Sequence, residues 1–291
     1  MAKFDFVSQR GDVLSLSANS DFYLTHIDGQ TTATASVSSN VIGGVDGDNV
    51  SNMQANFRSL IFDLRFKSGV DVEEAKRRIL RVIKLKQNGT VVWEQNGRTV
   101  AISGKVERID MPRWARGIVM QVEMHCEQPF WEDMKAVVEN ISEAIDLHYF
   151  TDNPTDMLYF TEEGIVIGEY DTTRSKNFYN DGDVDVGLEI DILALATVTN
   201  PIIYDANGNF FGVGYGTADK KVVMESGDKI VIATHRGSKS VTLNGESIFD
   251  KIKPNSAWFQ LATGDNRFAI NSDDDTLDNM TFTLIYKQRY V

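Results

Sequence analysis

The chain has 291 residues, 42% hydrophobic and 24% charged, so it is long enough for two ordinary domains or one large β domain and can bury a core. Its one cysteine, Cys126, excludes an intramolecular disulfide and a cysteine-based zinc site. The net charge of −13 is uneven, because residues 1–133 hold 16 Lys and Arg against 17 Asp and Glu, and the remainder holds 13 against 25. Acidic surfaces repel phosphate backbones, so sequence-specific nucleic-acid binding is not expected.

The start of the chain, MAKFDFVSQRGD, carries charges and lacks the apolar stretch of a signal peptide. No uninterrupted apolar run reaches about 18 residues, so membrane insertion is not expected. We therefore expect a protein that is made and kept in a cytoplasm unless lysis of a host cell releases it.

Short apolar segments alternate with turn residues over the first 50 positions, which predicts β structure with hairpins or loops. Turns are expected at Asp28-Gly29 and over 43–47. The clearest early strand covers 58–66, where four large apolar side chains alternate on one face: Leu60, Phe62, Leu64 and Phe66.

The apolar period changes to three and four residues from Asp71 to about Lys86, which predicts a helix. Asp71 and Glu74 have the spacing of a capping box, and Asn88-Gly89 is expected to end the helix. The basic residues spread around it, which favours a solvated or subunit-facing surface over a nucleic-acid face: Lys76, Arg77, Arg78, Arg81, Lys84 and Lys86.

A hairpin is predicted around a Gln-Asn-Gly turn between 91–93 and 98–102, and strands over 104–109 and 118–126 complete the first sheet. The last strand ends before Pro129, which cannot donate a ladder hydrogen bond. Its side chains alternate between two faces, with Val119, Gln121, Glu123 and His125 on one and Met120, Val122, Met124 and Cys126 on the other.

Residues 134–150 fit either a helix or an extended connector. From Asp152 onward, turn residues return at short intervals, as in Asn180-Asp181-Gly182-Asp183 and Asn244-Gly245, with short apolar runs between them. This spacing predicts an antiparallel sandwich. The chain is therefore expected to be mainly β, with an N-terminal domain over 1–133 that holds one helix and a hairpin, a connector over 134–150 and a C-terminal β-sandwich over 151–291.

No motif selects a catalytic, cofactor-binding or metal-binding residue, and we predict none of the three. The Asp-rich turns at 180–185 and 272–275 lack the EF-hand spacing, and the glycine-rich run 212–216 opens no helix, so it lacks phosphate-cradle geometry. Among 42 acidic residues some carboxylate pair will have a glycosidase-like separation, but sequence cannot select it. The histidines lack zinc-protease spacing, and His125 faces away from Cys126: His26, His125, His148 and His235.

Four tryptophans could in principle line a sugar platform, although burial in a core or interface is their ordinary role. They are Trp93, Trp114, Trp131 and Trp258.

The ending Pro129-Phe130-Trp131 after Cys126 resembles the close of the first domain in the distal tail proteins of long-tailed phages. Further segments resemble the same siphophage tail component family in the same order, and the likeness covers nearly the whole chain. They are 22–29, 44–47, Arg58 with its strand, the helix from Asp71, 103–109, 179–184, 200–202, 227–228 and 259–266.

The resemblance implies a virion structural protein and no enzyme. It implies an N-terminal ring-forming domain, a crossing segment that favours the extended connector, and a C-terminal galectin-like β-sandwich. Such a protein forms a homo-hexameric ring that caps the tail tube and binds the tube protein, the tail-associated protein and the receptor-binding proteins. It is assembled in the host cytoplasm and resides at the tail tip, where DNA can pass through the lumen.

Two other functions stay open from sequence. A carbohydrate-binding adhesion module would use the C-terminal sandwich and an exposed aromatic side chain such as Trp258. An enzyme that cleaves cell-wall glycans would need a carboxylate pair that the sequence does not identify.

Overall fold

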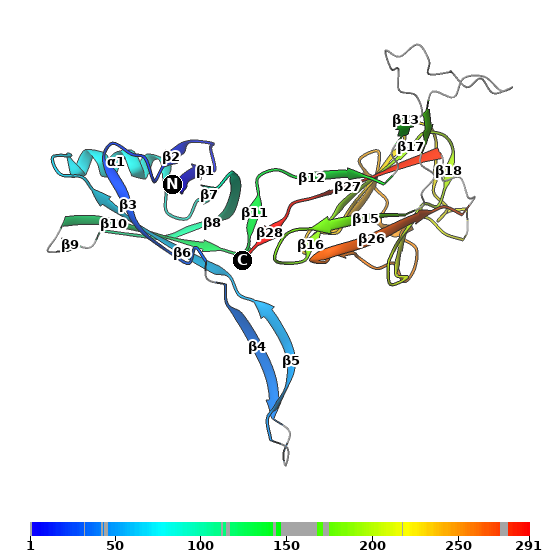
Figure 1. Cartoon of the computed structure of the whole chain (residues 1–291), viewed down its shortest axis with the longest axis horizontal. Helices are drawn as coiled ribbons and strands as arrows, with labels where there is room; N and C mark the ends of the chain where they lie inside the picture. The colour runs from blue at the N-terminus through cyan, green and yellow to red at the C-terminus, as the bar shows by residue number, and fades with distance from the viewer. Residues whose placement is uncertain are drawn as a thin grey trace, which may run out of the picture. The chain divides into compact units, whose positions relative to one another are not determined.

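The computed structural model describes residues 2–31, 33–41, 43, 46–111, 113–114, 117–141, 144–146, 168–170, 175–216, 218–273 and 279–291. The chain divides into two compact units (Figure 1). Unit 1 is Met1–Lys135 with Arg289–Val291, and unit 2 is Ala136–Gln288. The division therefore falls near the expected end of the first domain, but the last three residues lie in unit 1 and not in the second domain.

Unit 1 is built on a ten-stranded antiparallel sheet with the main path β2-β1-β7-β8-β10-β6-β3. Its path strands are β1 (Lys3–Ser8), β2 (Val13–Ser15), β3 (Phe22–Asp28), β6 (Arg58–Phe66), β7 (Asn88–Gln95), β8 (Arg98–Asp110) and β10 (Gly117–Cys126). Off this path are β9 (Arg113–Trp114), β11 (Trp131–Asp133) and β28 (Arg289–Tyr290). A separate two-stranded sheet joins β4 (Ala35–Val41) to β5 (Asp48–Ala55).

The core of unit 1 follows the alternation expected from the sequence. Phe62 on β6 is the register partner of Val122 on β10, and neither side chain is exposed. Cys126 is also fully buried, whereas His125 on the opposite face is partly exposed, which confirms that the two side chains diverge. Ala75 and Ile79 of the helix join the same core.

The helix α1 (Val72–Val82) begins as predicted and ends earlier than predicted. The Asp71 side chain accepts hydrogen bonds from the backbone N–H groups of Glu73 and Glu74, at 3.0 and 3.2 Å. The expected end at Asn88-Gly89 is wrong, because Ile83 is already extended and Asn88 begins β7. Pairing with β8 redirects the chain, since Lys86 N donates to the carbonyl of Val106 at 2.9 Å.

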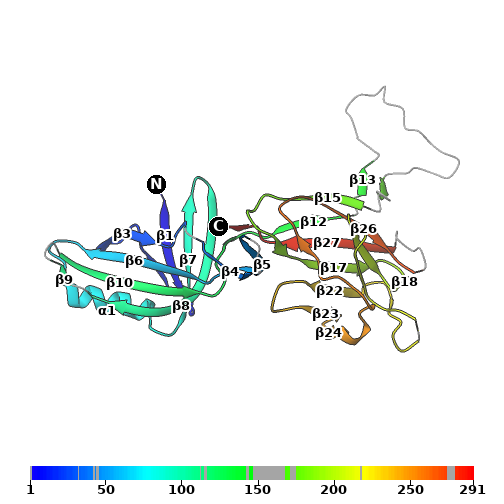
Figure 2. The ribbon, with the colours of Figure 1, turned by 90° about the horizontal axis from the view of Figure 1, so that it is seen from below.

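Unit 2 contains a six-stranded and a four-stranded antiparallel sheet. The first has the order β12-β27-β17-β22-β23-β24 (Figure 2) and the second the order β15-β26-β19-β20. The first comprises β12 (Val137–Asn140), β17 (Glu189–Ala194), β22 (Lys229–Ala233), β23 (Ser240–Leu243), β24 (Glu246–Ser247) and β27 (Met280–Tyr286). The second comprises β15 (Ser175–Asn180), β19 (Ile202–Asp205), β20 (Phe210–Gly212) and β26 (Gly264–Asn271).

Smaller two-stranded sheets and a 3-10 helix complete unit 2. They are β13 (Ala144–Asp146) with β14 (Gly168–Tyr170), β16 (Val186–Gly187) with β25 (Gln260–Leu261), β18 (Val198–Thr199) with β21 (Val223–Met224), and η1 (Phe249–Lys251).

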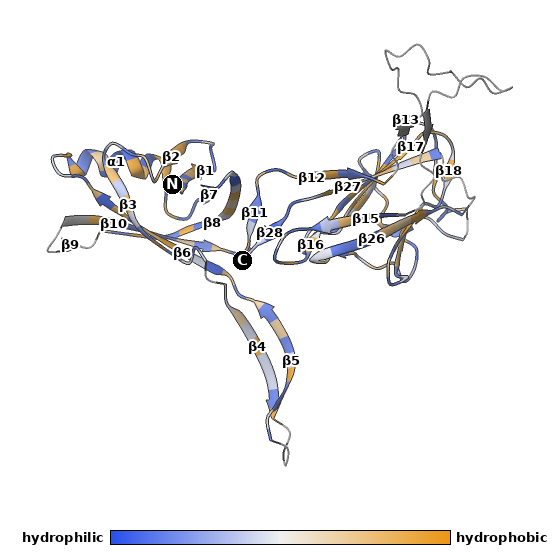
Figure 3. Cartoon of the chain, viewed as in Figure 1, coloured by the Kyte–Doolittle hydropathy of each residue, from blue (hydrophilic) through white to orange (hydrophobic). Residues whose placement is uncertain are grey.

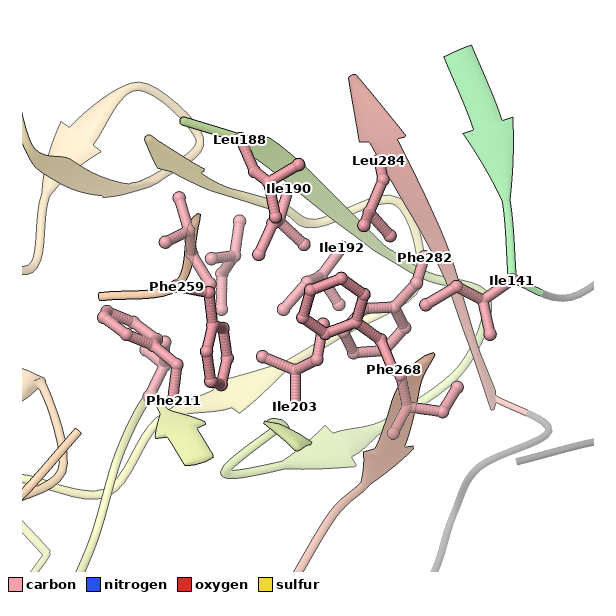
Figure 4. Close-up of a cluster of buried hydrophobic side chains, with 14 of the residues drawn as sticks. Ile141, Leu188, Ile190, Ile192, Ile203, Phe211, Phe259, Phe268, Phe282 and Leu284 are labelled. Carbon is pink, nitrogen blue, oxygen red and sulfur yellow. The ribbon is translucent and has the colours of Figure 1, made fainter. Parts of the chain in front are cut away.

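Side chains from both main sheets meet in one core (Figure 4). Ile190 and Phe282 come from the six-stranded sheet, and Ile203 and Phe268 come from the four-stranded sheet. The mainly β fold and the antiparallel sandwich expected from sequence are therefore confirmed. In the expected connector 134–150, residues 137–140 are extended and form β12 of the sandwich, while 142–143 and 147–150 lie outside the described residues.

No helix in the described ranges is long and apolar enough to span a membrane.

Candidate functional site: an exposed hairpin

The β4–β5 hairpin of unit 1 is exposed along its whole length. Every residue of both strands is exposed, including Val41 at 81% and Met53 at 65%. Figure 1 shows it as a two-stranded ribbon that stands apart from the ten-stranded sheet of the same unit. The hairpin therefore buries none of its side chains within the described chain.

The two faces of this hairpin differ in polarity. Val37 faces Met53 in the register, and Ser38 faces Asn52 on the other side. We call the first side the apolar face; it comprises Ala35, Val37, Val41, Val50, Met53 and Ala55, together with Ser39 opposite Val50 and Asp48 opposite Val41. The polar face comprises Ser36, Ser38, Asn40, Asn49, Asn52 and Gln54. Figure 3 shows this mixture of hydropathies along both strands.

Such a hairpin is not expected to be stable alone in water. Its edges carry none of the charged or proline residues that usually block pairing with another chain, because Asp46 and Asp48 at the turn are its only charges between 35 and 55. An exposed apolar sheet face of this kind marks a surface that another molecule covers.

The foot of the hairpin is fixed by two residues that carried the family resemblance. Arg58 Nη1 and Trp131 Nε1 both donate to the backbone carbonyl of Gln30, at 2.8 and 2.9 Å. Arg58 is 3% exposed and Trp131 is 1% exposed. Burial lowers the pKa of the Arg58 guanidinium from its ordinary value. The structure thus brings the Pro-Phe-Trp ending and the Arg58 strand together at the base of the exposed hairpin.

Gly29 and Phe57 flank the same foot. Gly29 has φ +78°, and a Cβ built there would lie 2.0 Å from the carbonyl oxygen of Ser59, so the turn expected at Asp28-Gly29 requires glycine. Phe57 follows β5, stacks on His125 with ring centroids 4.2 Å apart and is 55% exposed. Phe57 therefore adds an exposed aromatic ring beside the hairpin.

The basic residues of α1 do not make one charged face. Arg78 pairs with Asp21 at 3.1 Å, Arg77 and Arg81 are exposed, and the exposed Glu73 lies on the first turn of the same helix. This arrangement agrees with a solvated or subunit-facing surface.

Trp258 is partly buried, in keeping with the packing role that is ordinary for tryptophan. It packs against the core of unit 2. Phe249 stacks on it at 5.7 Å, the edge of Phe211 meets it at 4.8 Å, and Lys239 Nζ lies 5.2 Å from its ring centroid. Trp93 and Trp131 pack in the core of unit 1, and the side chain of Trp114 lies outside the described residues.

The other residues weighed for chemistry are dispersed. His26 and His125 lie on β3 and β10 of unit 1, His235 follows β22 of unit 2, and His148 lies outside the described residues. Of the Asp-rich turn at 272–275, only 272–273 is described. Within the described ranges, no group of three or more His, Cys, Asp or Glu side chains could hold a metal ion. The glycine-rich run 212–216 follows β20, and Gly214 and Gly216 both have positive φ.

The fold places the chain in a class of mainly β proteins that pair a ten-stranded sheet unit with a β-sandwich. Residues 181–290 match the model of the family described as siphovirus-type tail component, C-terminal domain. This match covers most of the sandwich and confirms the resemblance to phage distal tail proteins there.

Two solved structures are similar over the whole chain. One is the Dit (gp 19.1) protein of phage SPP1, described as a paradigm of the hub adsorption apparatus in phages that infect Gram-positive bacteria. It is 14% identical with a TM-score of 0.67, and the alignment covers 99% of each chain. The other is a chain of the phage P2 baseplate in its activated conformation with Ca, 12% identical with a TM-score of 0.48 and 98% of each chain covered. No curated protein sequence gives a significant match.

The two-unit fold of this chain is thus that of the SPP1 protein. Sequence analysis located the turn at 43–47 but missed how long the hairpin is. The signal was present, because Ala35, Val37 and Val41 alternate with Ser36, Ser38 and Asn40.

Proposed function

We propose that this protein is a virion structural component, the distal tail or baseplate hub of a siphophage-type particle. Six copies form a ring through unit 1 that caps the tail tube. The ring binds the tube protein and the tail-associated protein, and unit 2, a galectin-like sandwich, attaches receptor-binding proteins. The family match of residues 181–290 and the fold shared with the SPP1 hub protein support this proposal.

The exposed hairpin is the observation that supports the proposed ring most directly. Its apolar face would be covered by the neighbouring copy, because a closed ring repeats one head-to-tail contact between two different surfaces of the same chain. Burying side chains such as Val37 and Met53 stabilises a contact by about 1.5 to 3 kcal/mol each, if the burial is complete. Arg58 and Trp131, both buried, hold the chain just before the hairpin through the carbonyl of Gln30.

The nearly neutral charge of unit 1 is compatible with a channel through which DNA passes. Residues 1–133 are nearly neutral, with 16 cations against 17 anions, so a lumen lined by this unit would not bind DNA tightly. The function needs no catalytic residue, cofactor or metal. We propose assembly in the host cytoplasm and a final location at the tail tip.

The test is the mass of the purified full-length protein by light scattering over a range of concentrations, with negative-stain images of the same samples. We expect rings with six-fold symmetry. The variant Val37→Lys/Met53→Lys places two charges on the apolar face and should abolish the rings. The matched variant Ser38→Lys/Asn52→Lys changes the adjacent register pair on the polar face and should retain them.

Rings that survive Val37→Lys/Met53→Lys would show that the apolar face is not the ring contact. A wild-type chain that remains monomeric both alone and with tail tube protein would overturn the ring itself.

No specific observation favours the carbohydrate-binding alternative, because Trp258 is only partly exposed and packs against Phe211 and Phe249. Glycan binding that disappears in Trp258→Ala would revive it.

A further inference from the structure

Unit 2 has an aromatic cluster at its surface around Trp258. The ring of Phe249, on η1, stacks on Trp258 at an interplanar angle of 23° and is 51% exposed. Phe211, on the inner side, is 1% exposed and belongs to the core. Trp258 is therefore anchored in the core and supports Phe249 in a fixed, solvent-exposed position.

Lysines from separate segments gather at this cluster. Lys239 Nζ lies over the Trp258 ring, and Lys220 Nζ pairs at 2.9 Å with Asp250, the neighbour of Phe249. Lys253 Nζ lies 5.8 Å from the centroid of Phe210, on the strand that carries Phe211. We call Phe249, Trp258, Lys220 and Lys239 the aromatic–lysine patch. Asp250 offsets the charge of Lys220, so Lys239 over the Trp258 ring gives the patch its positive charge, in a part of the chain that holds 13 cations against 25 anions.

A second exposed aromatic side chain on unit 2 has the opposite charge around it. Tyr179 lies near the end of β15 and is 58% exposed. Its register partner Asp265 is exposed, as are Asp181 and Asp183 in the following loop. We call these four residues the tyrosine–carboxylate knob.

The loop of this knob is held in one shape by Asn180, which is 1% exposed. Its Nδ2 donates to the carbonyls of Val184 and Leu261 at 3.1 and 3.2 Å. Its Oδ1 accepts from the backbone N–H of Gly182 at 3.0 Å. A loop that is ordered in advance loses little conformational entropy on docking.

The two surfaces lie on opposite sides of unit 2. Figure 2 shows β15, which carries Tyr179, on one side of the sandwich, and β23 and β24, which lead into η1, on the other. Two knobs would repel each other, whereas a knob and a patch combine the knob carboxylates and the Lys239 ammonium with exposed aromatic rings. This favours a head-to-tail contact between copies over a symmetric one.

We infer that the aromatic–lysine patch of one copy binds the tyrosine–carboxylate knob of the next copy, so that neighbouring sandwiches contact each other. The inference rests on the proposed ring and adds a second interface to it, separate from the hairpin of unit 1. Tyr179 would pack against Phe249, and Lys239 would face Asp181 or Asp183.

The test is chemical cross-linking of the full-length protein. Tyr179→Cys/Phe249→Cys treated with a short bis-maleimide should give a ladder of linked chains. Tyr179→Cys alone and Phe249→Cys alone, each with one reactive cysteine, should give no product. The native Cys126 is fully buried and does not compete.

Reversing the charge of Lys239 tests whether the patch recognises the carboxylates of the knob. In the double-cysteine protein, Lys239→Glu should lower the yield of linked chains about two- to five-fold, in keeping with a pair of exposed charges. Adding Asp183→Lys to the same chain restores opposite charges across the contact and should recover the yield.

Rings by light scattering without a ladder would overturn this inference and leave the proposed function intact. A ladder without rings would support the contact and count against the ring. Products from either single-cysteine variant would indicate a symmetric contact and would overturn the head-to-tail assignment.

Discussion

Arg289 donates from Nε to Oε1 of Glu132 at 2.7 Å, although 157 positions separate the two residues. Their backbones are also register partners, in the pairing of β28 with β11. The chain therefore leaves unit 1 after β11 and returns to pair with the same strand after completing unit 2. In sequence, unit 2 is therefore an insertion between β11 and β28 of unit 1.

Tyr290 should stabilise unit 1 more than any other residue of the returning segment. It is 8% exposed, its hydroxyl donates to Asp133 Oδ2 at 2.9 Å, and the Arg98 guanidinium lies 4.3 Å from its ring centroid. We expect Tyr290→Ala to lower the free energy of unfolding of unit 1 by about 3 kcal/mol, as for other buried aromatic residues. Urea unfolding followed by tryptophan fluorescence would measure it, since Trp131 pairs with Tyr290.

Tyr290→Phe is the control for that substitution. It keeps the ring and loses only the hydrogen bond, at a cost of about 1 kcal/mol. If both variants unfolded at the same urea concentration as the wild type, the returning segment would not contribute to the stability of unit 1.

Gly29 should tolerate no larger residue, because of the close approach of Ser59. We expect Gly29→Ala to cost more than about 3 kcal/mol, since a Cβ 2.0 Å from a backbone oxygen forces β3 or β6 to move. The thermal unfolding midpoint by circular dichroism would show this.

Gly47 also has positive φ, at +99°, but a Cβ there meets nothing within 4 Å. Gly47→Ala should therefore cost only about 1 kcal/mol. Equal effects of the two alanines would mean that backbone conformation, and not the contact with Ser59, makes Gly29 necessary.

Local periodicity was enough to predict the elements whose burial follows from their own sequence. Leu60, Phe62 and Leu64 on β6 are fully buried as expected, and Asp71 caps α1 as expected. In these segments each residue's environment depends on its parity along a strand or on its position in a helical turn.

Features that depend on distant partners could not be predicted in the same way. Tyr290 returns to unit 1 through a two-residue pairing with a strand that is far away in sequence. The helix α1 ends early because the backbone N–H of Lys86 donates to β8. Trp258 could not be assigned to the surface or the core, because its neighbours Phe211, Phe249 and Lys239 come from three other segments.

The β4–β5 hairpin shows a different limit of prediction from sequence. Alternation of Val37 and Val41 with serine and asparagine ordinarily predicts a strand with one face in a core. In the structure both faces are exposed, and it is the proposed contact with a neighbouring copy that would give the apolar face its burial.

Asn200 should be needed for two hydrogen bonds that join separate loops of unit 2. It is 4% exposed, its Oδ1 accepts from the backbone N–H of Val222 at 2.9 Å, and its Nδ2 donates to Asp273 Oδ2 at 2.7 Å. Asn200→Ala leaves the buried N–H of Val222 without this acceptor, at about 1 to 3 kcal/mol. The φ of +48° adds about 1 kcal/mol for a residue with an alanine side chain.

Asn255→Ala provides the matched control for Asn200→Ala. Asn255 has a φ of +66° but is exposed, so its replacement should cost only the conformational part, about 1 kcal/mol. Chemical unfolding of both variants gives the two free energies, and their difference measures the hydrogen bonds. A difference near zero would mean that the loops near Val222 and Asp273 are held by other contacts.

Cys126 should make the stability of unit 1 depend on pH in the alkaline range. Burial raises the pKa of its thiol from 9.0 to about 11, and the nearby Arg58 guanidinium offsets this only in part. The unfolded chain therefore releases this proton near pH 9, and the folded chain releases it near pH 11. Between these values the unfolded state binds fewer protons, so the free energy of unfolding falls as pH rises, by about 2 to 3 kcal/mol in all.

Cys126→Ala removes the titrating group and should lack this contribution. The cavity it leaves lowers stability by an amount that does not change with pH, so the two proteins are compared by slope. We expect the difference in free energy of unfolding between wild type and variant to be constant below about pH 9 and to shrink toward about pH 11. A difference that stayed constant through this range would show that the thiol titrates alike in the folded and unfolded chains, and that it is not shielded from water beside Arg58.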